Sequence, residues 1–214
     1  PQQPDPRRSH ALPFSMSGPA DGGDHSGPRR GYHRAMSDSA MSDRDRAVLR
    51  HMIATLAYRG GKVLRDAPAG FGDFTASGVL NTPRVLLVHV VDLVDWARRF
   101  CTGDEDAYVI SEPSTWDGEV ARFFAALDGF DRAAQTAALP ASLERVFQAP
   151  IADALTHIGQ LALLRRMAGA PVLGESYRKA EIVAGRVGRE QAPPGREFAL
   201  DRGALWRPKD PTGN

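Results

Sequence analysis

The sequence predicts an all-α fold, namely a four-helix bundle with a disordered N-terminal leader and an irregular C-terminal tail. Three observations support this prediction. Residues 41–183 contain long stretches in which apolar side chains recur at helical spacing. Most of the glycines and prolines in this region fall between those stretches. The strand signals, such as Tyr108, Val109 and Ile110, are too short and isolated to form a sheet, and four amphipathic helices of roughly 20 residues pack most simply as a bundle.

The first two helices have recognisable starts and ends. The first is predicted over about residues 42–64, before a loop rich in glycine, proline and phenylalanine. The second begins at Thr82-Pro83, where a capping residue precedes a proline at the first helical position. It is expected to end near Cys101, because Gly103 follows.

The third and fourth helices follow the same logic. The third is expected to start near Ser114, with a face made of Trp116, Val120, Phe123, Phe124, Leu127 and Phe130. The fourth is predicted to begin at Pro150 and to end at Gly169, with Pro171 just beyond it. A brief further helical segment is expected over about residues 175–184.

The ends of the chain differ from its middle in composition. Residues 1–40 hold 6 Pro and 5 Gly but only 9 hydrophobic residues, too few to offset the entropy of ordering them. We therefore expect a disordered leader over residues 1–40, a helical domain over residues 41–184 and a tail rich in glycine and proline over residues 185–214. The length of 214 residues leaves little room for a second full-sized domain.

The charge balance and the cysteine content restrict the partners and the compartment. The 27 Lys and Arg residues against 26 Asp and Glu residues give a net charge of +1, far from the basic excess that nucleic-acid binding usually needs. No apolar run reaches the roughly 18 residues of a membrane span. The single cysteine, Cys101, allows no internal disulfide, which suits a reducing compartment. We expect a cytoplasmic protein that acts on a small molecule and binds neither nucleic acid nor membrane.

His89 lies in the middle of the apolar arc of the second helix. On a helical wheel of about 100° per residue it falls between Trp96 and Phe100, whereas the charged Asp92 and Asp95 fall outside the arc. We therefore expect His89 to point into the bundle. A buried imidazole needs a hydrogen-bonding partner or a ligand there, because an unsatisfied buried polar group is costly.

The fourth helix carries a polar stripe. Asp153, His157 and Gln160 stand at positions i, i+4 and i+7 and so share one side of the helix. Between Pro150 and Leu164 the sequence has no Lys, Glu or Arg, which favours a buried helix that presents a polar site. The alternative is that the stripe is the solvent-facing side of an otherwise buried helix, which the helical wheel does not exclude.

Together, His89, Asp153 and His157 supply two imidazoles and one carboxylate. Three protein ligands that leave one coordination position open are typical of catalytic metal sites. The alternative is a metal-free arrangement in which His89 bonds Asp153 directly while His157 packs or is hydrated. Gln160 is the candidate for orienting a ligand from outside the coordination sphere. His51 of the first helix is a candidate extra ligand, although it projects away from the apolar arc of that helix.

Residues 153–169, DALTHIGQLALLRRMAG, resemble the last-helix signature of the DinB/YfiT-like metalloenzyme family. The stretch from Thr82-Pro83 through His89 to Trp96 resembles the second helix of that family, and the resemblance spans most of residues 45–170. It implies a four-helix bundle in which a histidine of the second helix and a His-x-x-x-His pair of the last helix hold a divalent metal, commonly zinc or nickel. His89 and His157 match two of these ligands, whereas Asp153 stands at the position of the remaining histidine.

This departure from the family pattern leaves two functions open. An aspartate ligand indicates an altered metal preference or a site that has lost its metal, and two histidines with one carboxylate also suit non-haem iron. The resemblance implies a hydrolase, or a thiol-dependent transferase or isomerase, that acts on a small molecule with a low-molecular-weight thiol as candidate co-substrate. The alternative is a non-catalytic helical bundle, a candidate homodimer, that keeps the fold without the metal.

Overall fold

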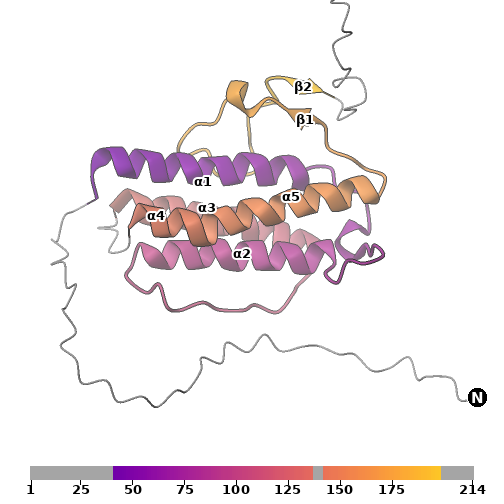
Figure 1. Ribbon diagram of the computed structural model, residues 1–214, viewed down its shortest axis with the longest axis horizontal. Coiled ribbons are helices and arrows are strands. Elements are labelled where there is room, and N and C mark those ends of the chain that lie inside the picture. Colours follow the sequence, from indigo (N-terminus) through magenta and orange to yellow (C-terminus); the bar gives the residue numbers. More distant parts are fainter. Residues whose placement is uncertain (1–40, 137–141, 199–214) are drawn as a thin grey trace, which may run out of the picture. The chain divides into compact units, whose positions relative to one another are not determined.

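The structure, a computed structural model, describes residues 41–136 and 142–198. This part of the chain is mostly helical, which confirms the all-α prediction (Figure 1). Its four long helices are α1 (Asp43–Leu64), α2 (Pro83–Phe100), α3 (Trp116–Thr136) and α5 (Ala152–Met167). None of the described helices has both the length and the apolar character needed to cross a membrane. The predicted leader, residues 1–40, lies outside the described residues.

Two of the helices begin where the sequence supplies capping side chains. Ser42 accepts a hydrogen bond from the backbone N–H of Asp45 at the start of α1. Thr82 accepts one from the N–H of Val85 at the start of α2, whose first residue is Pro83. Such acceptors satisfy N–H groups that have no partner within the first helical turn. The predicted starts of these two helices are confirmed.

The helical segment that leads into α5 starts earlier than the start predicted at Pro150. Ser142 caps a short helix, α4 (Leu143–Val146), which continues through a π-helical turn, η2 (Phe147–Ile151), into α5. Pro150 therefore lies inside a continuous helical segment. A proline lacks the backbone N–H and its ring crowds the preceding turn of an α-helix. The prediction was wrong because a wider π turn, which accommodates such a residue, leaves no signal in the apolar spacing.

The four long helices share one hydrophobic core. Helices α1 and α2 each pack against both α3 and α5, and Figure 1 shows α5 between α1 and α2 with α3 behind them. Phe123 and Phe130 of α3 and Leu49 and Ile53 of α1 are fully buried in this core. At the contact of α1 with α3, a Cβ on Gly60 would collide with the ring of Phe123, so only glycine permits this close approach.

The segment that follows α5 is extended rather than helical. Its strands β1 (Gly174–Glu175) and β2 (Glu197–Phe198) form a short antiparallel pair. Of the helix predicted over residues 175–184, the structure retains one 3₁₀ turn, η3 (Tyr177–Lys179), and the prediction of a helix there was wrong. A second 3₁₀ turn, η1 (Phe71–Asp73), lies in the loop between α1 and α2.

Glu175 explains why the extended conformation is favoured there. Its carboxylate is buried, accepts hydrogen bonds from the hydroxyl of Tyr58 (2.6 Å) and the ammonium group of Lys62 (2.8 Å), and so joins β1 to α1. Lys62 also pairs with Glu197 of β2 at 2.7 Å. Val187, between the strands, is buried in the core. Val187 and Glu197, which both lie in the predicted tail, therefore contact the helical domain.

Arg165 of α5 secures the end of α1. The side chain is 5% exposed and its guanidinium donates hydrogen bonds to the carbonyl oxygens of Val63 (2.8 Å), Arg65 (2.9 Å) and Asp66 (3.1 Å). The last carbonyl groups of a helix lack partners within that helix. The guanidinium satisfies that of Val63 and those of the two residues just beyond the helix, and a cation at this position interacts favourably with the helix dipole.

Candidate metal centre

Helices α2 and α5 bring together the three side chains predicted to bind a metal. His89 projects from α2, and Asp153 and His157 project one turn apart from α5. Their candidate ligand atoms all lie within 4.8 Å of one another. Nε2 of His157 lies 3.2 Å from Oδ1 of Asp153, and Nε2 of His89 lies 3.8 Å from Oδ2. The carboxylate thus faces both imidazoles, one through each oxygen.

The other nitrogen of each imidazole is already engaged. Nδ1 of His157 lies 2.8 Å from Oε1 of Gln160, and Nδ1 of His89 lies 3.0 Å from the hydroxyl of Tyr108. The amide oxygen of Gln160 is an acceptor for Nδ1 of His157, and Nε2 is the nitrogen directed at Asp153. The Tyr108 oxygen can accept from His89 in the same way. This is the arrangement of metal-binding histidines, in which a partner of one nitrogen orients the other.

The metal-free alternative pairs His89 with Asp153, whereas the structure brings His157 closer to that carboxylate. A distance of 3.8 Å between His89 Nε2 and the Asp153 carboxylate is too long for a hydrogen bond. His157, which that alternative leaves packed or hydrated, is the histidine closer to Asp153. The Asp153 carboxylate therefore lies near both imidazoles and is closer to that of His157.

The cluster is more exposed than the helical wheel predicted. The side chains of His89, His157 and Asp153 are 39%, 19% and 48% exposed. The expectation that His89 points into the core was wrong, because the apolar arc of α2 is wider than its buried face and Val85 at its edge is also exposed. The stripe on α5 is the solvent-facing side of that helix, which was the second of the two interpretations left open.

The environment of the cluster favours a neutral imidazole at position 89. Partial burial lowers the pKa of His89 below its ordinary 6.5, and the neighbouring His157 acts in the same direction, whereas Asp153 opposes the shift. Burial also raises the pKa of Tyr108, with Asp92 and Asp153 adding to the effect. His89 is therefore neutral near pH 7 and Tyr108 keeps its proton, as metal binding through Nε2 requires.

The donor set and its spacing fit a divalent metal. Two imidazole nitrogens and one carboxylate suit zinc, nickel or non-haem iron. Metal–ligand distances of about 2.1 Å place the ligand atoms of a tetrahedral site about 3.4 Å apart. The nitrogen–oxygen distances of 3.2 and 3.8 Å lie on either side of this value. The exposed side of the cluster leaves room for a water molecule or a substrate atom.

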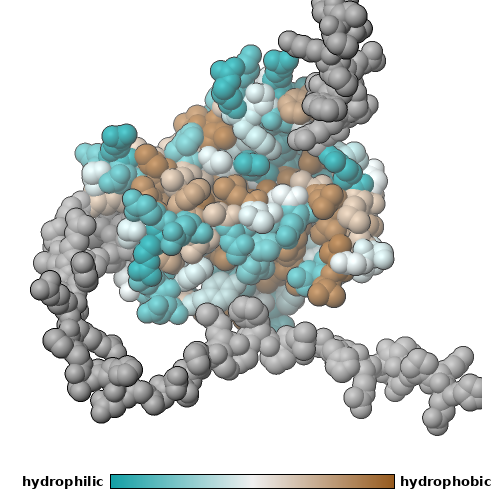
Figure 2. Space-filling view, in the orientation of Figure 1, coloured by the Kyte–Doolittle hydropathy of each residue, from teal (hydrophilic) through white to brown (hydrophobic). Residues whose placement is uncertain are grey.

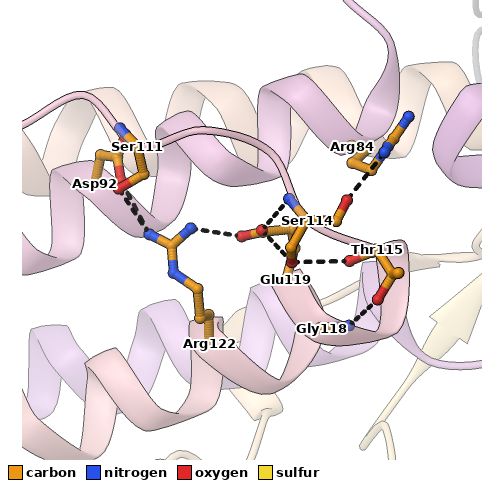
Figure 3. A network of polar contacts seen from close by, with 8 residues as sticks. All are labelled: Arg84, Asp92, Ser111, Ser114, Thr115, Gly118, Glu119 and Arg122. Atoms are coloured by element: carbon orange, nitrogen blue, oxygen red, sulfur yellow. Dashed lines mark hydrogen bonds and ion pairs between the residues drawn. The ribbon is translucent and has the colours of Figure 1, made fainter.

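A buried polar network holds the loop that carries Tyr108 (Figure 3). Arg122 of α3 bridges the carboxylates of Asp92 and Glu119 at 3.0 and 2.7 Å, and both carboxylates are almost fully buried. Asp92 in turn accepts from the backbone N–H of Ser111, and Glu119 from the N–H and hydroxyl of Ser114. The loop between α2 and α3 is thereby fixed over α2, which places Tyr108 beside His89.

Sequence reasoning missed the role of Tyr108 and the burial of Asp92. The sequence shows Tyr108 only as part of a short strand signal, in which Tyr108, Val109 and Ile110 are three consecutive hydrophobic residues of a polar loop. Asp92 lies outside the apolar arc of α2 but is covered by the loop and by Arg122. Neither relationship leaves a signal in helical spacing, because both depend on where an irregular loop lies.

Two other residues considered from the sequence are not part of the centre. His51 is exposed on α1 and does not join the His89, Asp153 and His157 group. Cys101 is buried at the end of α2, and burial raises the pKa of its thiol to about 11. A protonated, buried thiol is a poor nucleophile.

Comparisons with protein-family models, with curated proteins and with solved structures gave no match to this chain. The assignment of function therefore depends on the chemistry of the site.

Proposed function

We propose that the chain is a metal-dependent enzyme that acts on a small molecule, with His89, Asp153 and His157 as the metal ligands. The observation that carries the proposal is the orientation of the two imidazoles. Each has its Nδ1 engaged by a neighbouring side chain and its Nε2 directed at one carboxylate. Two imidazole nitrogens and one carboxylate directed at a common point are donors that suit a divalent metal.

Each residue has a distinct role in this proposal. His89 and His157 bind the metal through Nε2, and Asp153 supplies a negative charge that favours a divalent cation. Gln160 and Tyr108 orient the two imidazoles. A bound metal would polarise a substrate oxygen or lower the pKa of a bound water molecule. The open side of the cluster admits the substrate.

We further propose that the fold is a four-helix bundle of the DinB-like type and that the reaction is a hydrolysis or a thiol-dependent transfer or isomerisation. The resemblance of residues 82–96 and 153–169 to that family supports this class. Zinc or nickel is the expected metal and iron the alternative, since a carboxylate replaces one histidine. A low-molecular-weight thiol as co-substrate, a cytoplasmic location and a homodimer belong to the same proposal.

Metal analysis of protein purified without a histidine tag tests the proposal. We expect about one divalent metal ion per chain and a lower melting temperature in the presence of a chelator, because a metal bound only to the folded state stabilises it. Protein that takes up no metal and melts at the same temperature with and without chelator would instead support the non-catalytic bundle.

A further inference from the structure

A groove opens beside the candidate metal centre, between the start of α2, the loop that precedes it and the second half of α5. Its volume is about 390 Å³, within the range of small-molecule sites. The apolar side chains that line it include those of Val79, Leu80, Leu86, Leu163 and Met167. The polar side chains in its lining are those of Asn81 and Gln160.

The apolar lining is unusually open to solvent. Leu80 is fully exposed, and Leu163 and Met167 are 54% and 48% exposed. Figure 2 shows hydrophobic residues gathered on this face over the neighbouring ends of α2 and α5. Between Asp153 and Arg165 the exposed face of α5 carries no charged residue to break the patch. A contiguous apolar patch in a concave surface usually marks a binding site.

The groove is continuous with the metal centre through Gln160. This side chain lines the groove, and its oxygen also lies 2.8 Å from Nδ1 of His157. Leu163 follows His157 by about 9 Å along the helix axis, given a rise of 1.5 Å per residue. A ligand of modest length can therefore reach both the cluster and the apolar lining.

We propose that the groove binds the apolar part of the substrate, whose polar end reaches the metal. The substrate class is then an amphiphilic small molecule, in which an alkyl, acyl or aromatic group carries an oxygen or sulfur donor. A polyhydroxylated ligand suits the groove poorly, because Asn81 and Gln160 offer few hydrogen-bonding partners and the Gln160 oxygen is engaged by His157. This inference rests on the proposed metal-dependent function.

The test compares two hydroxamates that share a metal-binding head and differ in chain length. Acetohydroxamate and octanohydroxamate are titrated calorimetrically into the full chain after loading with zinc. We expect octanohydroxamate to bind at least about tenfold more tightly, because burial of each methylene group strengthens binding. The double variant Leu163→Ser, Met167→Ser should remove this advantage while the affinities for zinc and acetohydroxamate stay unchanged.

A matched control shows that the effect belongs to the groove. Val183 is 46% exposed but does not line the groove, so Val183→Ser should keep the advantage of octanohydroxamate. All these positions are exposed, and circular dichroism verifies that the variants fold.

The possible results separate the two proposals. A chain that takes up no zinc overturns the proposed function and this inference with it. Two results would overturn only the inference about the groove. The first is a protein that binds zinc and acetohydroxamate but binds octanohydroxamate no more tightly. The second is a double variant that keeps the full preference for octanohydroxamate. Dimerisation that Leu163→Asp abolishes, together with no advantage for octanohydroxamate, would assign the groove to a second copy of the chain and overturn the inference.

Discussion

The side-chain oxygen of Gln160 lies 2.8 Å from Nδ1 of His157, one turn earlier on the same exposed side of α5. This contact orients the imidazole, so that Nε2 is the nitrogen directed at Asp153. Gln160 is not itself a candidate metal ligand, but it determines which nitrogen of His157 faces the candidate metal site.

Replacement of Gln160 by leucine should weaken metal binding without unfolding the protein. The substitution keeps the size of the side chain but removes the acceptor that holds the Nδ1 proton of His157. We expect the affinity for zinc to fall about tenfold to a hundredfold, as is typical when an outer partner of a ligand is lost. A competition titration with a chromophoric chelator measures this change.

The control for this variant is Thr156→Val on the same face of α5. The hydroxyl of Thr156 bonds the backbone carbonyl of Ala152 and takes no part in the cluster, so the zinc affinity should stay unchanged. Equal affinities in wild-type protein and Gln160→Leu would show that the contact does not support the site.

The adjacent residues Arg165 and Arg166 should differ sharply in their effect on stability. Arg165→Met leaves the carbonyl oxygens of Val63, Arg65 and Asp66 without their donor, which we expect to cost about 3 kcal/mol of unfolding free energy. Arg166 is exposed, and Arg166→Met should change the free energy by less than about 0.5 kcal/mol. Urea denaturation of both variants measures the difference, and similar values for the two would contradict the role given to Arg165.

Two helical glycines should respond in opposite directions to replacement by alanine. A Cβ at Gly60 would collide with the ring of Phe123, and we expect Gly60→Ala to destabilise the fold by about 1–3 kcal/mol. A Cβ at Gly159 meets nothing within 4 Å, so Gly159→Ala should stabilise α5 by about 0.5–1 kcal/mol. Thermal unfolding of the two variants measures whether each substitution raises or lowers the stability. A stabilising Gly60→Ala substitution would show that α1 and α3 do not pack this closely.

Much of the helical structure could be predicted from the sequence, because apolar spacing and capping residues are local signals. The starts of α1 and α2 and the buried face of α3 follow from Ser42, Thr82 and the phenylalanines of α3. The start of the last helical segment could not be predicted, because the π turn around Pro150 lets the helix continue through a proline that would usually mark its boundary. The strand at Glu175 could not either, because it depends on partners from distant parts of the chain.

For the candidate site, the sequence predicted which residues meet but not how they are surrounded. The i, i+4 spacing of Asp153 and His157 is a local property of a helix, and His89 meets them because α2 packs against α5. Exposure of His89 and its contact with Tyr108 depend on the loop between α2 and α3, whose position is set by the buried network around Arg122.

The attachment of the C-terminal segment to α1 should weaken in acid. Burial alone would raise the pKa of Glu175, but hydrogen bonds from Lys62 and Tyr58 outweigh it and hold that pKa below the ordinary 4.5. A carboxyl whose pKa is lower in the folded state stabilises the fold above its unfolded pKa, and this stabilisation is lost as the pH falls through the folded value. The free energy of unfolding should therefore decrease below about pH 4.5 through this group.

Glu175→Gln isolates this contribution, because the amide does not titrate. The difference in melting temperature between wild-type protein and the variant should stay constant from about pH 6 to pH 7.5 and shrink as the pH falls below about 4.5. A difference that is the same at every pH would mean that folding does not change the pKa of Glu175.

The most direct test of the metal centre is an equilibrium zinc titration of the full chain and of four single alanine variants. We predict one zinc site per wild-type chain, loss of that site in His89→Ala, Asp153→Ala and His157→Ala, and full retention in His51→Ala, whose side chain lies on α1 outside the cluster. A wild-type chain that binds no zinc, or a site that survives all three of the first variants, would contradict the assignment.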